Sequence, residues 1–156
     1  MNDLDFLRRA VELARGNLDS GYGGPFGAVV VVNGRIVGEG SNQVLRDHDP
    51  TAHAEVVAIR AACRALAQFH LGGATLYTSC EPCPMCLAAA HWAQIARVVY
   101  AADRGDAAAA GFQDADLYRL FEGTAPPSAL RRERIALDEA QAVMRTWAQL
   151  PHRIPY

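Results

Sequence analysis

Two short motifs about thirty residues apart constrain this chain more than any other feature. The first is Thr51–Glu55 (TAHAE) and the second is Ser79–Cys86 (SCEPCPMC). One imidazole and closely spaced thiols suit a tetrahedral metal ion, and a carboxylate two residues from the imidazole can move protons. Both motifs can serve one ion only if they meet in space. The fold must therefore bring two distant segments together.

The spacing of apolar residues predicts helices and strands that alternate along most of the chain. The expected elements are a helix over 5–18, strands over 28–32 and 35–39 joined by the turn Asn33-Gly34, a helix over 52–68, a strand over 75–79, a helix over 85–96 and a strand over 97–101. Further along, we expect a short helix near 115–121, a strand over 134–137 and a helix over 139–150. This alternation favours an α/β fold with a largely parallel sheet.

The chain is 156 residues long, and 51% of its residues are apolar. This is the length of one ordinary domain, with enough apolar side chains for a core that needs no metal to fold. We therefore expect residues 1–156 to form a single domain. Ligands of α/β sheets bind outside the ends of strands, and both motifs fall at predicted junctions between strands and helices.

The charge pattern argues against nucleic acid or a membrane surface as a partner. All 15 basic residues are arginines, the net charge is −2, and the cluster Arg131–Arg134 is interrupted by an acid. Such a chain lacks the positive surface that neutralises phosphates. The acidic residues near the start and the lack of a long apolar run predict neither a secretory signal nor a membrane span, so we expect a cytoplasmic protein.

The two motifs predict a zinc site with three protein ligands, His53, Cys83 and Cys86. Cysteines three residues apart favour a metal over a disulfide in a reduced compartment. Both motifs lie at predicted helix N-termini, whose partial positive charge stabilises thiolates. Three ligands leave the fourth tetrahedral position to water, and Glu55 can take a proton from that water. The pattern therefore predicts hydrolytic chemistry.

Three other interpretations use the same residues. Cys80 could complete a closed structural site with four ligands, but the charge of Glu55 would then lack a partner. An iron–sulfur site is disfavoured because the run Cys80-x-x-Cys83-x-x-Cys86 lacks a fourth cysteine three residues further on. A nucleophilic cysteine is disfavoured by two thiols at metal spacing beside a separate His-x-Glu.

At these residues the sequence resembles the cytidine/deoxycytidylate deaminase superfamily, and within it the bacterial guanine deaminases. The pattern H-x-E followed by P-C-x-x-C is typical of zinc deaminases. The likeness covers nearly the whole chain and is carried by Gly24–Val30, Asp49–Val56, Leu76–Cys86, Asp106–Ala108, Gly111–Asp114 and Tyr156. It implies a three-layer α/β/α sandwich with a mixed, largely parallel five-stranded sheet, bound Zn²⁺, and hydrolysis of guanine to xanthine and ammonia in purine metabolism.

The resemblance also implies two polar contacts with the substrate. Asn42 resembles the family's ring-binding amide, although an Asn at such a position is also common in turns. Asp114 resembles the second carboxylate of the guanine enzymes, which the resemblance assigns to the catalytic group together with Glu55. A carboxylate suits guanine because the ring presents an N–H and an amine side by side. As an alternative, Asp114 could cap a helix that starts near residue 115.

Other substrate-binding candidates are Phe26, Ala54, Trp92 and Tyr156. Phe26 and Trp92 could stack on a ring or pack as ordinary core aromatics. Members of this family are homodimers that exchange C-terminal segments, which implies that Tyr156 closes over the partner's site as a lid. Without the resemblance, a frayed terminus is the expected state of these residues.

Competing functions remain open at this point. Enzymes that deaminate adenosine in tRNA share the metal motif, although the negative net charge argues against RNA as a substrate. Guanosine, cytosine or a triazine could also enter a site built for a planar amino-bearing ring. A zinc-binding interaction module without catalysis is the alternative from a different class.

Overall fold

A computed structural model describes residues 1–112, 114–124 and 133–154 of this chain. The chain divides into two compact units, Met1–Ala125 and Pro126–Tyr156. The first unit carries both sequence motifs and all the strands of the described ranges. Across those ranges, no helix has the length and apolar character needed to cross a membrane.

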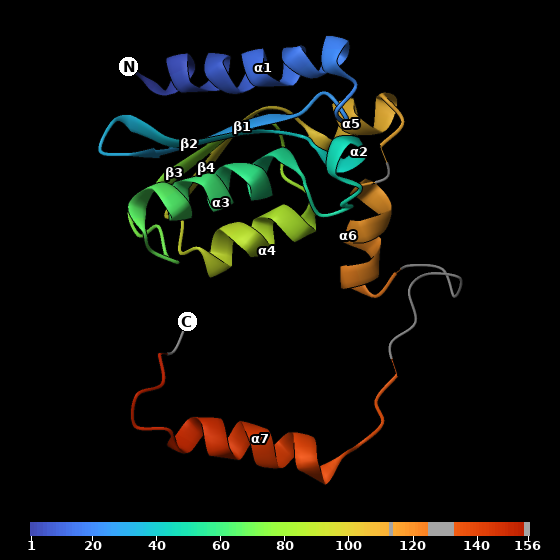
Figure 1. Ribbon diagram of the computed structural model, residues 1–156. Coiled ribbons are helices and arrows are strands. Elements are labelled where there is room, and N and C mark those ends of the chain that lie inside the picture. Colours follow the sequence, from blue (N-terminus) through green and yellow to red (C-terminus); the bar gives the residue numbers. More distant parts are fainter. Residues whose placement is uncertain (113, 125–132, 155–156) are drawn as a thin grey trace. The chain divides into compact units, whose positions relative to one another are not determined.

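Helices and strands alternate through the first unit (Figure 1). They are α1 (Asp3–Ser20), β1 (Gly27–Val32), β2 (Arg35–Ser41), α2 (Val44–Asp47), α3 (Ala54–Leu66), β3 (Thr75–Cys80), α4 (Pro84–Trp92), β4 (Arg97–Ala102), α5 (Arg104–Ala109) and α6 (Asp114–Glu122). The helices and strands predicted up to residue 121 are confirmed, with ends that differ by a few residues. The short helices α2 and α5 were not predicted, because so few residues show no helical period.

The predicted hairpin and its turn are confirmed. Asn33 and Gly34 have φ angles of 49° and 73°, as a two-residue turn between twisted strands requires. Strand β1, which leads into this turn, runs through the centre of the unit, where Val29 and Val30 are fully buried.

The sheet has the strand order β2-β1-β3-β4, which differs from the predicted sheet in two respects. The described residues form four strands, so the predicted total of five is not confirmed. Both β2 and β3 pair with β1 in antiparallel fashion, and β4 alone adds a parallel pair, so the sheet is mixed and the prediction of a largely parallel one is wrong. The reason is topological. The chain crosses from β2 through α3 to the far side of β1, so β3 pairs with a strand of opposite direction.

Helices cover both faces of the sheet (Figure 1). On one face, α1 packs Phe6 into a cluster with Val29 and Tyr77. On the other face, α3 and α4 bury Ala58 and Ala90 in a larger apolar cluster. Apolar side chains of α3 and α4 therefore hold these helices against one face of the sheet. Both metal motifs lie where these two helices begin.

The described part of the second unit holds one helix, α7 (Asp138–Gln149). Residues 134–137, predicted as a fifth strand, have no regular structure. A strand needs a neighbour for its hydrogen bonds, and the described part of this unit offers none. None of the residues of α7 is buried, and Val143, Met144 and Trp147 form an exposed apolar stripe on it.

Candidate metal centre and substrate cavity

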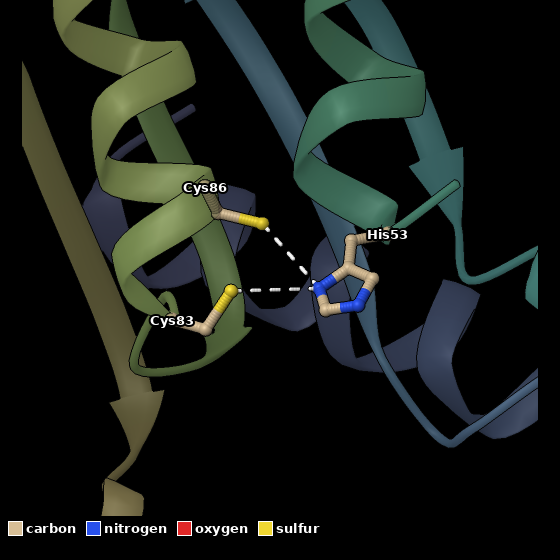
Figure 2. Close-up of side chains that lie close together, drawn as sticks. All are labelled: His53, Cys83 and Cys86. Atoms are coloured by element: carbon tan, nitrogen blue, oxygen red, sulfur yellow. Dashed lines mark hydrogen bonds between the residues drawn. The ribbon is translucent and has the colours of Figure 1, made fainter. Parts of the chain in front are cut away.

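The imidazole and the two thiols converge on one point (Figure 2). The Nδ1 atom of His53 lies 3.6 Å from the Sγ atom of Cys83 and 3.5 Å from that of Cys86. Zinc binds nitrogen at about 2.0–2.1 Å and sulfur at about 2.3 Å, so a tetrahedral arrangement separates the two ligand atoms by about 3.6 Å. The observed spacing fits a zinc ion without rearrangement of these side chains. His53, Cys83 and Cys86 therefore form a possible metal site.

Two helix N-termini supply these ligands. His53 is the N-cap residue of α3, Cys83 is the N-cap residue of α4, and Pro84 occupies the first turn of α4. A hydrogen bond from Cys86 lowers the pKa of the Cys83 thiol to about 4, and the same bond raises the pKa of Cys86. The contact with Cys83 raises the pKa of His53. The sulfur of Cys83 is thus poised to be a thiolate, the form that binds metal.

Cys80 stands apart from this group. Its thiol donates to the carbonyl oxygen of Asp103 over 3.4 Å, and burial raises its pKa to about 11. Within the described ranges, the cluster of possible metal ligands comprises His53, Cys83 and Cys86 without Cys80. This arrangement weighs against a closed structural site with four protein ligands, the alternative weighed from the sequence.

Glu55 lies in the first turn of α3, two residues after the histidine, and is buried. Its burial raises the pKa of its carboxyl group. A carboxylate with a raised pKa accepts a proton more readily at neutral pH. The geometry thus puts a proton-transfer group at the wall of the cavity that also holds the donor atoms of His53 and Cys83.

The cavity has a volume of about 530 Å³, within the range of about 300–1,000 Å³ usual for small-molecule sites. Its lining brings together His53, Glu55 and Cys83 with Phe26, Asn42, Phe112 and Asp114. Gly23 and Gly24 and residues of α2 also line it. Four of the residues assigned to catalysis or substrate binding from the sequence thus share one cavity with His53 and Cys83, two of the three candidate metal ligands.

Asn42 is buried and held firmly at the cavity wall. Its Oδ1 atom accepts from the Val44 N–H over 3.1 Å, which leaves the Nδ2 amino group as its remaining polar end. The side-chain amide of Asn17 donates to the carbonyl oxygens of both Asn42 and Gly24, over 2.7 and 2.8 Å. The amino group is therefore the end of this amide that is left to donate to a ligand.

An aromatic pair forms another wall. Phe26 and Phe112 meet edge to face, with ring centroids 4.7 Å apart. Gly24 lies against both rings, and a Cβ atom there would come within 2.9 Å of Phe26 and 3.0 Å of Phe112. Sequence reasoning found Phe26 but missed Phe112. The signal was present, because Phe112 lies in the Gly111–Asp114 segment that carries the resemblance.

Asp114 begins α6 and lines the cavity. Partial burial raises the pKa of its carboxyl group, and the nearby Cys83 acts in the same direction. The Asp114 carboxylate therefore lies in a partly desolvated part of the cavity, where two N–H donors would bind it strongly.

The remaining sequence candidates lie elsewhere. Ala54 is fully buried in the core around Leu76 and is not part of the cavity lining. Trp92 ends α4, is 60% exposed and does not line the cavity either. Tyr156 lies outside the described residues. Among these aromatic side chains, Phe26 and Phe112 line the cavity and Trp92 does not.

Known proteins resemble this chain along its full length. A family model for the cytidine and deoxycytidylate deaminase zinc-binding region matches residues 1–102. A guanine deaminase from Bacillus subtilis is 46% identical over 156 residues, which is all of both chains. The crystal structure of guanine deaminase from that organism superposes with a TM-score of 0.94 over 100% of this chain and 99% of the other.

More distant relatives share part of the chain. A guanine deaminase from Nitrosomonas europaea is 31% identical, with a TM-score of 0.67 over 79% of this chain and 66% of the other. A tRNA-specific adenosine deaminase from Agrobacterium fabrum is 49% identical over 78 residues, about half of either sequence. The likeness to the Bacillus protein extends through the segment that carries Phe112 and Asp114.

Proposed function

Because the chain belongs to the cytidine and deoxycytidylate deaminase family, we propose that it is a zinc-dependent guanine deaminase, which hydrolyses guanine to xanthine and ammonia. The observation that carries this proposal is that the carboxylates of Glu55 and Asp114 line the same cavity as His53 and Cys83. The full-length likeness to a guanine deaminase supports the same substrate.

Proton transfer is the task of Glu55. A zinc ion held by His53, Cys83 and Cys86 would acidify a water molecule at its open coordination position. Glu55 takes a proton from the attacking water and delivers it to a ring nitrogen of guanine. It then takes the second proton, from the hydroxyl group now attached to the ring carbon, and passes it to the amine, so that the C–N bond breaks, ammonia leaves and the carbonyl group of xanthine forms. The buried position of Glu55 suits this cycle, because its raised pKa makes the carboxylate a better base.

Recognition of the ring divides between polar and apolar groups. Asp114 accepts the ring N–H and the exocyclic amine of guanine, two donors that lie side by side. The Nδ2 group of Asn42 donates to an acceptor on the ring. Phe26 and Phe112 supply the flat apolar surface against which a purine packs.

Adenosine in tRNA is the second candidate substrate, because a tRNA-specific adenosine deaminase is similar in sequence to half of this chain. The net charge of −2 disfavours it, since RNA binding needs phosphate-neutralising side chains. Guanosine, cytosine and triazines are rings that the same cavity could also take.

Ammonia release across a panel of guanine, guanosine, adenine, cytosine and a tRNA anticodon stem tests the substrate. The proposal expects kcat/KM for guanine to exceed every other value by a wide margin. A preference for another ring, or for the RNA, would overturn the assignment. A protein that binds zinc but releases no ammonia from any of them would be a structural module.

The active assembly in this proposal is a cytoplasmic homodimer that exchanges C-terminal segments. The free thiols of the described residues suit a reduced compartment. An isolated helix of 12 residues such as α7 is marginal in water, so its apolar stripe calls for a folded surface to cover it. In such a dimer, residues 134–137 could pair as a fifth strand, and Tyr156 would serve as the lid.

Deletion of residues 151–156 tests the lid. We expect the truncated protein to keep zinc and to lose turnover, because water would then reach the reacting groups. Kinetics identical to those of the full chain would contradict the lid, and a monomer in analytical ultracentrifugation would contradict the dimer.

A further inference from the structure

Helix α6 carries Asp114 but has little packing of its own. None of its side chains whose burial is described is fully buried, and Phe121 is 71% exposed. A helix held so lightly needs specific contacts to keep its first residue pointed into the cavity.

Tyr118 provides one such contact. Its hydroxyl donates to the carbonyl oxygen of Pro82 over 3.0 Å. Pro82 is fully buried and directly precedes the metal ligand Cys83. The hydrogen bond therefore ties α6 to a fixed point of the metal-binding segment.

Arg104 holds the ring of Tyr118 in place. The guanidinium carbon lies 4.1 Å from the ring centroid. The same side chain pairs with the carboxylate of Glu81, with its Nη2 atom 3.0 Å from Oε1, and the Arg104 N–H donates to Oε2 over 3.0 Å. Glu81 is only 13% exposed and lines the cavity. We call the group of Glu81, Pro82, Arg104 and Tyr118 the brace.

The brace bears directly on Asp114. Tyr118 follows Asp114 by four residues in the same helix, so the two side chains lie on the same face, one turn apart. Fixing the Tyr118 hydroxyl against Pro82 sets the position of that face relative to Cys83. A shift of α6 would carry the Asp114 carboxylate with it.

We propose that Tyr118 is a positioning residue for substrate recognition: its bond to Pro82, supported by Arg104, docks α6 so that Asp114 faces the ring of the substrate. This inference rests on the proposed deamination of guanine and adds the residue that aligns its recognition group. Tyr118 acts through Asp114 and touches neither substrate nor metal.

The test is the variant Tyr118→Phe, which removes one hydroxyl and keeps the ring under Arg104. We expect kcat/KM for guanine to fall about 5- to 10-fold, the worth of one hydrogen bond, with one zinc per chain retained. In the Asp114→Asn background the same change should cost less than about twofold, because the group that Tyr118 aligns is already impaired.

Tyr22→Phe is the matched control. Arg46 lies over the Tyr22 ring at 5.2 Å, but among the described residues the Tyr22 hydroxyl makes no hydrogen bond. Tyr22→Phe should leave kcat/KM unchanged. A wild-type kcat/KM in Tyr118→Phe, or a full loss that persists in the Asp114→Asn background, would overturn the inference.

A second variant, Arg104→Gln, keeps the hydroxyl and removes the cation over the ring. We expect a loss of about 2- to 5-fold, the worth of an exposed cation–π contact, again absent in the Asp114→Asn background. If the wild-type protein itself releases no ammonia from guanine, the proposed function fails. If the wild-type protein is active and neither variant differs from it, only the role of the brace fails.

Discussion

The two sides of the cavity are built differently. His53, Glu55 and Cys86 lie at the starts of α3 and α4, which pack on the sheet, and Cys86 has no exposed surface. Asp114 lies on α6, which has no fully buried side chain among those described. The side to which we assign the chemistry is thus fixed by the core, whereas the side to which we assign recognition of the ring is fixed by a few polar contacts. Changes on the first side should abolish turnover, and changes on the second should retune it.

The largest effect is expected from Cys86→Ala. Removal of one of two thiolates should lower bound zinc from one per chain to nearly none, and turnover should disappear with it. Cys80→Ala is the control, because the Cys80 thiol bonds to Asp103 and not to the metal group. Metal analysis of both variants checks this. Loss of zinc in Cys80→Ala would show that a fourth protein ligand had been overlooked.

Glu55→Gln should separate zinc binding from chemistry on the same side of the cavity. The amide cannot accept a proton, so kcat should fall by about 10²–10⁴-fold, the usual contribution of general acid–base catalysis. Zinc content should stay at one per chain. An ammonia assay beside metal analysis measures both, and normal turnover in the Glu55→Gln variant would remove Glu55 from the mechanism.

The two sides also differed in how far the sequence predicted them. The possible metal site of His53, Cys83 and Cys86 could be predicted, because the geometry of one ion dictates the spacing of these residues in the sequence. The brace could not, because its role depends on where α6 docks, and that docking depends on side-chain contacts between distant segments. Phe112 was missed although it lies in the segment that carries the resemblance.

The fold shows the same division. Periodicity predicted the strands and the longer helices of the first unit, since burial imposes it locally, but not the short helices α2 and α5. It could not give the pairing of β3 with β1, because strand order depends on the crossover through α3 rather than on local pattern. The strand expected over residues 134–137 is not confirmed for a related reason, since pairing needs a partner that local sequence does not name.

Asp114→Asn should show the milder effect expected of the second side. The amide can accept one of the two N–H groups of guanine but repels the other with its own N–H donors, so kcat/KM should fall about 10- to 100-fold. Zinc content should not change. Asp116→Asn, an exposed change in the same helix, serves as the control. An equal loss for guanine and for a poor substrate such as adenine would contradict a role in recognition.

The smallest effect is expected away from both sides. Arg9 and Glu39 form a bidentate pair with N–O distances of 2.7 and 2.9 Å, and the hydrogen bond from Arg9 lowers the pKa of Glu39 below its ordinary value of 4.5. The pair therefore stabilises the fold above pH 4.5, and this contribution is lost as pH falls below that value through the folded-state pKa.

Glu39→Gln should therefore lower the free energy of unfolding by roughly 0.2–1 kcal/mol at pH 7, because the pair is more than a third exposed and solvent screens it. Near pH 3 the difference should shrink toward zero. Urea unfolding at both pH values measures it. A change in kcat/KM for guanine would show that this pair is coupled to the cavity after all.

The central claim is that one zinc ion is held by a single imidazole and two thiolates, with a coordination position left open. X-ray absorption spectroscopy of the zinc-loaded protein tests it most directly. The expected result is two sulfur ligands at about 2.3 Å and two nitrogen or oxygen ligands at about 2.0–2.1 Å. Three sulfur ligands, or no stoichiometric zinc, would contradict the account.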